Sequence, residues 1–299
     1  MLTIFADNIL PILLVAGVGF LAVRFLKADV QTLSSVTFYA LTPCLVFNTL
    51  VTSQISAAEF GRMVSFAVSM IAATGLVAGL VSLALRLDRA TTSAFLMVAM
   101  FTNAGNYGLP LVLFAFGQEA LALATVYFVS NFILMYTVGV LLAASGQHGT
   151  WKALVNVLKL PTVYVVAAAV VVMLARVTVP APIMRPIALL GNAALPMMIV
   201  VLGMQLGQAS LPERPWLVGV ATVFRLVVLP ALALVLASVL GLRGVEQQAA
   251  VVQAAMPTAV IVAVLALEYG AAPSFVTAVV FLSTVLSPLT LTPLIALLK

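Results

Sequence analysis

Ten long apolar segments determine what this chain can fold into. They lie near residues 5–26, 35–53, 60–85, 93–116, 120–145, 155–176, 186–208, 215–240, 246–267 and 273–298. A helix needs about 20 apolar residues to cross the hydrocarbon core of a bilayer, and each segment has that length. Only 7% of the residues are charged and 64% are hydrophobic, whereas about 25% of the residues of a soluble domain are charged. The sequence therefore predicts an all-α protein with ten transmembrane helices in a lipid bilayer. Several connections between the segments are short, so nine or eleven helices are the alternatives.

The ten segments divide into two sets of five around a polar stretch, Gly146–Lys152, which holds the only histidine, His148. We expect two five-helix halves, residues 1–149 and 150–299. An odd number of helices in each half gives the halves opposite orientations, and inverted repeats of this kind are common in secondary transporters. Prolines stand at corresponding positions of the two halves: Pro43 with Pro196, and Pro110 with Pro257.

The formal net charge is +5, but the Lys and Arg residues are scattered singly between the apolar segments. This distribution speaks against nucleic acid as a partner, because nucleic-acid sites cluster basic residues on one face. Basic residues next to membrane spans instead favour the cytoplasmic side. In the first half, the predicted cytoplasmic loops hold Arg24, Lys27, Arg86, Arg89, Lys152 and Lys159, and the opposite side holds Arg62. In the second half, Arg214 lies on the predicted cytoplasmic side. The opposite side holds Arg176, Arg185, Arg243 and Lys299.

We therefore place the central loop 146–154 in the cytoplasm and both termini outside, in a plasma (inner) membrane. No basic region precedes the first segment, and Asp7 lies before its apolar run. We accordingly expect the first segment to be retained rather than cleaved as a signal peptide.

The fourth segment contains the most informative motif, Thr102–Pro110 (TNAGNYGLP). Its asparagines, glycines and proline are poor helix formers, so we expect the helix to break near mid-membrane. Hydrocarbon cannot satisfy the freed N–H and C=O groups, so such a break must line a polar cavity or meet partner groups. A freed helix N-terminus, with the amides of Asn103 and Asn106, would suit an anion. The alternative is an intact helix that packs closely through its glycines.

The ninth segment has a similar interruption, Gln253–Ala259 (QAAMPTA). In an inverted repeat, the two broken helices would cross near the bilayer centre and form a substrate site between them. Asn48, which follows the proline of the second segment, is a further candidate. The complete set of candidate substrate-binding residues is Asn103, Gly105, Asn106, Gly108, Pro110, Gln253, Pro257, Thr258 and Asn48.

These motifs resemble the auxin efflux carrier family, which joins plant PIN auxin exporters to bacterial permeases for small carboxylates such as malonate and malate. The resemblance covers nearly the whole chain. Its most specific parts are Asn103–Leu111 (NAGNYGLPL), Val252–Pro257 (VQAAMP), the pair Glu268-Tyr269, and Pro43 followed by Phe47-Asn48. Plant members carry a proline where this chain has Thr102, so the first break is expected to depend on Gly105, Gly108 and Pro110.

The resemblance implies two inverted five-helix repeats of the kind found in bile-acid symporters, with helices 4 and 9 crossed. Helices 1, 2, 6 and 7 would form a scaffold, and helices 3–5 and 8–10 a transport domain that moves against it like an elevator. An asparagine at the first break receives the carboxylate in the family, and Asn103 is the matching residue. A homodimer is also compatible with the family.

Two charged residues need a separate interpretation. Arg225 lies roughly 15 Å along the eighth helix, and a buried arginine costs at least about 2.5–3.5 kcal/mol on insertion scales, so it needs a partner. Its role is open between attraction of an anionic substrate and capping of exposed carbonyl groups. Glu268 is a candidate for proton coupling, although acids near the ends of spans mostly lie at the interface.

The sequence thus predicts a secondary active transporter of a small organic anion, a mono- or dicarboxylate. The alternatives are a sodium or proton exchanger of the same fold and, with less support, a channel. Enzyme classes fit poorly, because the chain has no Gly-rich phosphate loop with a lysine and no cluster of metal ligands. No catalytic residue, metal or cofactor is expected, and coupling to protons or sodium stays open.

Overall fold

The computed structural model describes residues 1–143, 161–175, 177–207 and 215–299. Within these ranges the chain is helical, apart from connecting turns and one isolated bridge between Thr102 and Thr258. Seven described helices are long and apolar enough to cross a membrane. These are Leu2–Leu26, Val30–Thr52, Ala57–Ala84, Ala104–Ala143, Ala181–Leu206, Pro215–Val239 and Pro273–Leu298. The prediction of an all-α membrane protein is therefore confirmed.

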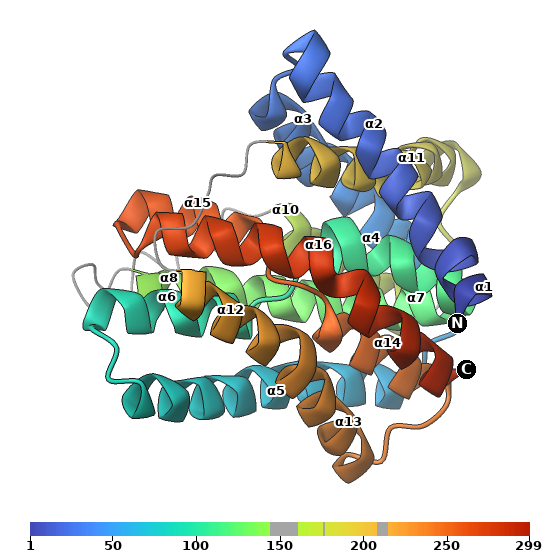
Figure 1. Cartoon of the computed structure of the whole chain (residues 1–299). Helices are drawn as coiled ribbons and strands as arrows, with labels where there is room; N and C mark the ends of the chain where they lie inside the picture. The colour runs from blue at the N-terminus through green and yellow to red at the C-terminus, as the bar shows by residue number, and fades with distance from the viewer. Residues whose placement is uncertain (144–160, 176, 208–214) are drawn as a thin grey trace.

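The helices follow the order of the apolar segments (Figure 1). The first part of the chain forms α1 (Leu2–Ile4), η1 (Phe5–Ile9), α2 (Leu10–Leu26), α3 (Val30–Val36), η2 (Thr37–Leu41), α4 (Thr42–Thr52), α5 (Ala57–Ala84), α6 (Arg89–Met100), η3 (Ala104–Gly108), α7 (Leu109–Leu134), η4 (Met135–Gly139) and α8 (Val140–Ala143). The remainder forms α10 (Pro161–Ala175), α11 (Ala181–Leu206), α12 (Pro215–Val223), η5 (Phe224–Val228), α13 (Leu229–Val239), α14 (Val245–Ala255), α15 (Ile261–Tyr269) and α16 (Pro273–Leu298).

The expected count of ten spans differs from these seven for local reasons. The fourth and ninth segments are interrupted, so α6, α14 and α15 have only 12, 11 and 9 residues. The second part of the fourth segment and the fifth segment lie in the 40-residue run Ala104–Ala143, where two helices meet at a kink at Gly117. Gly117 bends this run with φ at 83°, which glycine adopts without the strain that a side chain would cause. The described part of the sixth segment begins at Pro161 and has 15 residues.

Wide π-helical turns accommodate several of the prolines. A proline ring clashes with the carbonyl group four residues earlier, and a π-turn moves the preceding hydrogen bond one residue further back. The residue before the proline donates five residues back in four helices: Leu10 to Phe5, Thr42 to Thr37, Leu109 to Ala104, and Leu229 to Phe224.

The proline pairs expected to correspond between the halves have different surroundings. Pro43 follows the π-turn η2, whereas Pro196 lies inside the uninterrupted helix α11. Pro110 lies in the first turn of α7, whereas Pro257 lies between α14 and α15. The prolines of each pair therefore have different local roles, which sequence position alone could not reveal.

Helices α2 and α11 cross with their backbones nearly touching. A Cβ atom added to Gly203 would lie 1.7 Å from the carbonyl oxygen of Ala16, and one added to Gly19 would lie 2.0 Å from that of Val200. Small residues allow such close helix contacts in membranes. Helix α11 also packs on α4, and α4 on α10. Figure 1 shows α2, α3 and α11 together in the upper part of the view, apart from α5 and α13 below.

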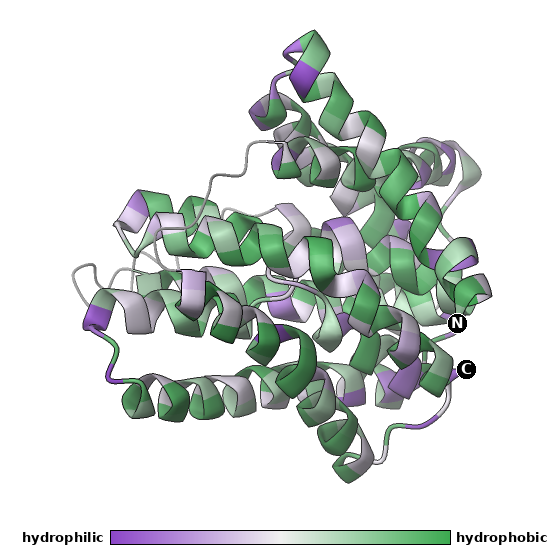
Figure 2. Ribbon diagram, in the orientation of Figure 1, coloured by the Kyte–Doolittle hydropathy of each residue, from purple (hydrophilic) through white to green (hydrophobic). Residues whose placement is uncertain are grey.

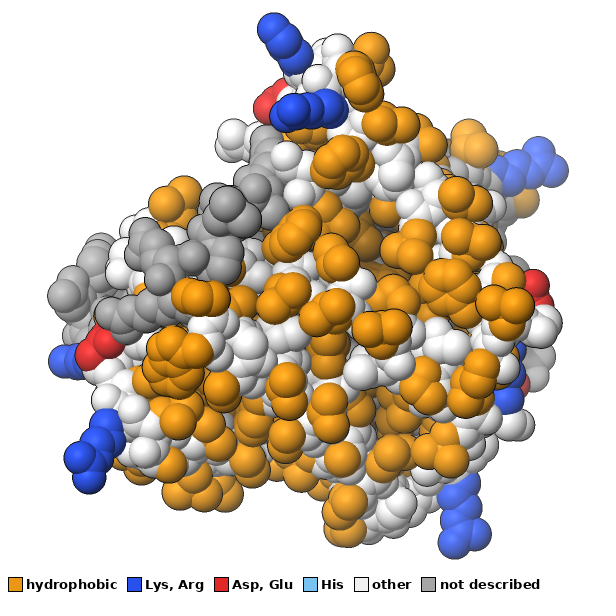
Figure 3. All heavy atoms as spheres, viewed as in Figure 1, with side chains coloured by type: hydrophobic (Ala, Val, Ile, Leu, Met, Phe, Trp, Pro, Cys, Tyr) orange, Lys and Arg blue, Asp and Glu red, His pale blue; other side chains and the backbone are white. Residues whose placement is uncertain are grey.

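The outer surface suits a bilayer. In Figure 2 the long helices are mostly hydrophobic, and hydrophilic residues gather at helix ends. The face shown in Figure 3 is covered by hydrophobic side chains, and the Lys and Arg side chains stand at its edges. Both termini lie at the same edge of the molecule in Figure 1. Several features of the predicted orientation fall outside the described residues: the loop 146–154 with His148, the division at 149/150, and Lys152, Lys159, Arg176 and Arg214.

The substitution Gly203→Ala is expected to destabilise the protein, because its methyl group would overlap the backbone of α2. Overpacking of this kind costs about 1–3 kcal/mol. The matched control is Gly79→Ala in α5, where an added Cβ meets no atom within 4 Å. Thermal unfolding in detergent should show a lower Tm for Gly203→Ala and an unchanged or higher Tm for Gly79→Ala. Equal Tm values for the two variants would contradict the close contact.

Candidate functional site

Two interrupted helices cross and pair at their breaks. The first interruption separates α6 from η3 and α7, and the second separates α14 from α15. The backbone N–H of Asn103 donates to Pro257 O at 2.8 Å, and the N–H of Ala259 donates to Phe101 O at 3.0 Å. These two bonds flank the antiparallel bridge between Thr102 and Thr258. We call residues Phe101–Asn103 and Met256–Val260, with the helix ends beside them, the crossover.

The two breaks have different local causes. Met256 is extended, with ψ at 150°, because the proline that follows it disfavours helical geometry. The first break begins at Phe101, which is also extended, with φ and ψ at −106° and 116°. Thr102 has no proline ring, and its extended form is held by pairing with the second segment.

Gly105, Gly108 and Pro110 lie beyond the first break, in η3 and the start of α7. The expectation that these residues produce the break is therefore not met. The glycines allow close packing instead. A Cβ on Gly108 would lie 2.3 Å from Gln253 Oε1, and one on Gly105 would lie 2.8 Å from the ring of Phe128.

Side-chain donors satisfy the carbonyl groups that the breaks expose. Arg225 is 1% exposed, and its guanidinium group reaches the C-terminal ends of both α6 and α14. Its Nη1 donates to Ala99 O at 2.7 Å, its Nη2 to Ala254 O at 2.8 Å, and its Nε to Met256 O at 2.8 Å. Thr258 Oγ1 donates to Val98 O at 2.8 Å.

These bonds correspond to the carbonyl-capping role that the sequence left open for Arg225. A planar guanidinium group suits this task, because its five N–H groups spread in fixed directions. Arg225 is the only charged side chain that is buried among the described residues. The cost of burying it is therefore offset by backbone dipoles rather than by an acid. Attraction of a substrate by Arg225 stays a hypothesis.

The hydrogen-bond donors of the crossover, in contrast, do not all have partners. Asn103 is 5% exposed and immediately precedes η3, and its Nδ2 is buried without a hydrogen-bond partner. The first N–H groups of a helix also lack partners within the helix. An acceptor placed beside Asn103 would therefore meet unpaired donors and the positive end of a helix dipole.

Gln253 is fully buried on α14 and faces the other broken helix. Its Nε2 lies 3.4 Å from Ala124 O, and its Oε1 has no donor. Buried polar atoms without partners are rare in proteins and often mark functional positions. Gln253 and Asn103 therefore remain the strongest of the candidate binding residues.

Three other candidates lie apart from this network. Asn106 Nδ2 lies 3.4 Å from Gln205 Oε1 and so links η3 to α11. Asn48 is half-buried on α4, where its backbone carbonyl accepts from Thr52. Glu268 is exposed at the end of α15, which agrees with an interfacial position. In the described part of the chain, the hydrogen bonds of the crossover include none of these three side chains.

Two residues outside the predicted set contact the crossover. Asn131 of α7 is buried, and its Nδ2 lies 3.3 Å from Thr102 O, while its Oδ1 lacks a donor. By sequence, Asn131 is one of several neutral polar residues expected near the cavity, and such residues more often join helices than bind a ligand. Ser283 of α16 accepts from the backbone N–H of Thr258 at 3.3 Å. A serine in an apolar span gives no signal of such a role, because it can usually bond to its own helix.

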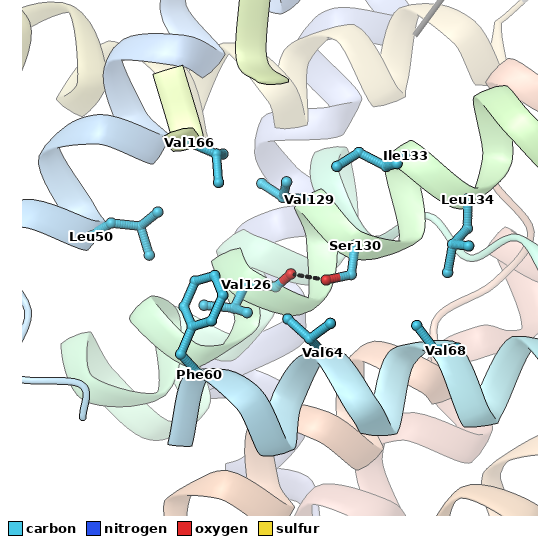
Figure 4. A pocket seen from close by; sticks show the side chains of 10 residues that line it. All are labelled: Leu50, Phe60, Val64, Val68, Val126, Val129, Ser130, Ile133, Leu134 and Val166. Carbon is cyan, nitrogen blue, oxygen red and sulfur yellow. Dashed lines mark hydrogen bonds between the residues drawn. The ribbon is translucent and has the colours of Figure 1, made fainter. Parts of the chain in front are cut away.

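A separate cavity of 310 Å³ lies between α4, α5, α7 and α10 (Figure 4). Its lining is apolar except for Ser130, whose hydroxyl donates to Val126 O at 2.9 Å. The cavity thus offers no free polar group to an anion. Among the described residues, no group of three or more His, Cys, Asp or Glu residues could hold a metal ion.

Removal of the guanidinium group should destabilise the protein strongly. We expect Arg225→Met to lower the free energy of unfolding by several kcal/mol, because it leaves the buried carbonyl groups of Ala99, Ala254 and Met256 without donors, at about 1–3 kcal/mol each. Arg225→Lys should fall between this variant and the parent, because a compact ammonium cannot reach both helix ends. Arg243→Met, at an exposed arginine, is the control. Thermal unfolding in detergent measures the series, and a parent-like Tm for Arg225→Met would refute the capping role.

Comparisons with known proteins place this arrangement in a family. The family model described as membrane transport protein matches residues 4–295. An uncharacterized transporter of Methanothermobacter thermautotrophicus is 28% identical over 265 residues, which cover 87% of this chain and 86% of that protein. An uncharacterized transporter of Methanocaldococcus jannaschii is 23% identical over 292 residues, 94% of each chain. The protein is thus a membrane-embedded transporter rather than an enzyme. The chain belongs to the auxin efflux carrier family of membrane transport proteins.

Proposed function

We propose that the protein is a secondary active transporter that carries a small organic anion, a mono- or dicarboxylate, at the crossover. One observation carries this proposal: the carbonyl groups of Val98, Ala99 and Ala254 at the crossover have side-chain donors, whereas the buried Nδ2 of Asn103 has no acceptor. A carboxylate beside Asn103 would supply that acceptor at the start of a helix, where anions are favoured.

We further propose ten transmembrane helices in two inverted five-helix repeats, residues 1–149 and 150–299, with α6–α7 and α14–α15 as the broken fourth and ninth helices. The antiparallel pairing of Thr102 with Thr258 supports this arrangement, since helices related by an in-plane axis would meet in opposite directions.

Transport would proceed by an elevator-like movement. The scaffold would consist of α2, α4, α10 and α11, which pack on one another with the glycine contact between α2 and α11. The transport domain would hold α5–α8 and α12–α16, including the crossover. The contact between Asn106 and Gln205 then spans the two groups and would break as they move.

The protein would lie in the plasma (inner) membrane with both termini outside and could assemble as a homodimer. Four exposed basic residues at the C-terminal ends of α2 and α5 and at the start of α6 support this orientation: Arg24, Lys27, Arg86 and Arg89. Coupling to protons or sodium stays open. An exchanger without an organic substrate has less support, because no Asp or Glu is buried among the described residues.

The variant Asn103→Ala should abolish carboxylate uptake while leaving a folded protein. A screen of small carboxylates for thermal stabilisation, with and without sodium, would first identify an acid for the assay. Uptake of that labelled acid into proteoliposomes is then compared for the parent, Asn103→Ala and the control Asn192→Ala, an exposed asparagine of α11. Normal uptake by Asn103→Ala would reject the site. Sodium or proton flux without any organic acid would favour an exchanger, and currents far above carrier turnover would favour a channel.

Linking the two helix groups should arrest transport. We expect Asn106→Cys with Gln205→Cys, in a Cys44→Ser background, to lose uptake when a short cleavable thiol cross-linker joins the pair, because the contact spans the moving boundary. Reductive cleavage should restore uptake to its level before cross-linking, and the uptake of each single-cysteine variant should be unchanged by the same treatment. Full uptake by the cross-linked protein would exclude the elevator-like movement.

A further inference from the structure

The crossover neutralises its two kinds of helix end differently. The C-terminal ends of α6 and α14 carry partial negative charge, and both meet the guanidinium group of Arg225. The N-terminal ends of the following half-helices, at Ala104 and Ile261, carry partial positive charge. No buried Asp or Glu lies among the described residues to balance them.

The charges can be counted from general magnitudes. Each helix end corresponds to about half an elementary charge. The two C-terminal ends therefore amount to about one negative charge, which Arg225 balances. The two N-terminal ends amount to about one positive charge, and no side chain of opposite sign is buried beside them.

The amide of Asn103 independently indicates that negative charge is missing at the helix N-terminal ends. Its Nδ2 is buried and unpaired at the start of η3, where a ligand acceptor would complete its hydrogen bonding. The neighbouring amide of Asn131 differs, because its Nδ2 already donates to Thr102 O. The unpaired donor thus coincides with the unbalanced positive helix end.

We propose that the crossover holds one negative charge at a time: its ligands are monoanions, and a dicarboxylate binds with one of its carboxyl groups protonated. This inference rests on the proposed function and narrows its substrate class. A second ionised carboxylate would be buried in the apolar interior without a counter-charge, which is strongly unfavourable.

A carboxylate introduced by mutation tests the count of helix-end charges without any ligand. Asn103→Asp places a carboxylate at the helix start without removing a hydrogen bond of Nδ2. We expect its ligand-free Tm to exceed that of the parent, and stabilisation by added monocarboxylates to disappear. Asn103→Leu, neutral and of similar size, should show no rise. Asn131→Asp should be less stable, because it sets a carboxylate against Thr102 O. A Tm of Asn103→Asp below those of the parent and Asn103→Leu would overturn the inference.

A second measurement uses the parent protein and ligands of one skeleton with different charge. Malonate, succinate and glutarate are each compared with their monomethyl and dimethyl esters at about pH 7.5, where unesterified carboxyl groups are ionised. We expect the monomethyl ester of the recognised skeleton to stabilise the protein at concentrations at least about tenfold lower than the diacid, equivalent to about 1.4 kcal/mol. The dimethyl ester should have no effect.

The outcomes separate this inference from the proposed function. A diacid that binds as tightly as its monomethyl ester overturns the single-charge inference and leaves carboxylate transport intact. If no small carboxylate stabilises the protein or is taken up, the proposed function fails. The comparison of Asn103→Asp with Asn103→Leu still decides the charge count in that case, because it needs no ligand.

Discussion

The structure depends on one constraint: a broken helix in hydrocarbon must find hydrogen-bond partners for the groups that it exposes. Arg225 and Thr258 supply donors for carbonyl groups of α6 and α14, and the two extended segments pair with each other. These contacts take the place of the water that would otherwise bind the exposed groups of the crossover. At Asn103 the same contacts leave one buried donor, Nδ2, without an acceptor.

The sequence was sufficient for the class of fold and for the location of the breaks. Apolar length identified the spans. The Asn, Gly and Pro residues of Thr102–Pro110 indicated an interruption in the fourth span, and the polar residues and Pro257 of Gln253–Ala259 indicated one in the ninth. The role of Gly105 and Gly108 was not predictable, since close packing and helix breaking both favour glycine. Only the closeness of Gln253 to Gly108 and of Phe128 to Gly105 shows that these glycines serve close packing.

The partners of Arg225 were not predictable for a different reason. Backbone carbonyl groups are present at every residue and leave no mark in a sequence, so a search for an acidic partner finds none. The partners of Asn131 and Ser283 were not predictable either, because these partners are backbone atoms of segments far away in the chain. The sequence thus shows which side chains can donate or accept hydrogen bonds. Their backbone partners can be identified only when the crossing of the helices is known.

The order of these contacts along the chain has a consequence for biogenesis. The groups that satisfy Val98, Ala99 and Phe101 come from Thr258, Arg225 and Ala259, all within the last third of the chain. While a ribosome delivers the protein from its N-terminus, α6 reaches the membrane well before any of these donors has been synthesised. Its C-terminal carbonyl groups must stay hydrated, or near the insertion machinery, until η5 and the break between α14 and α15 arrive. The first half therefore does not mature alone, and final closure of the crossover is a late event in assembly.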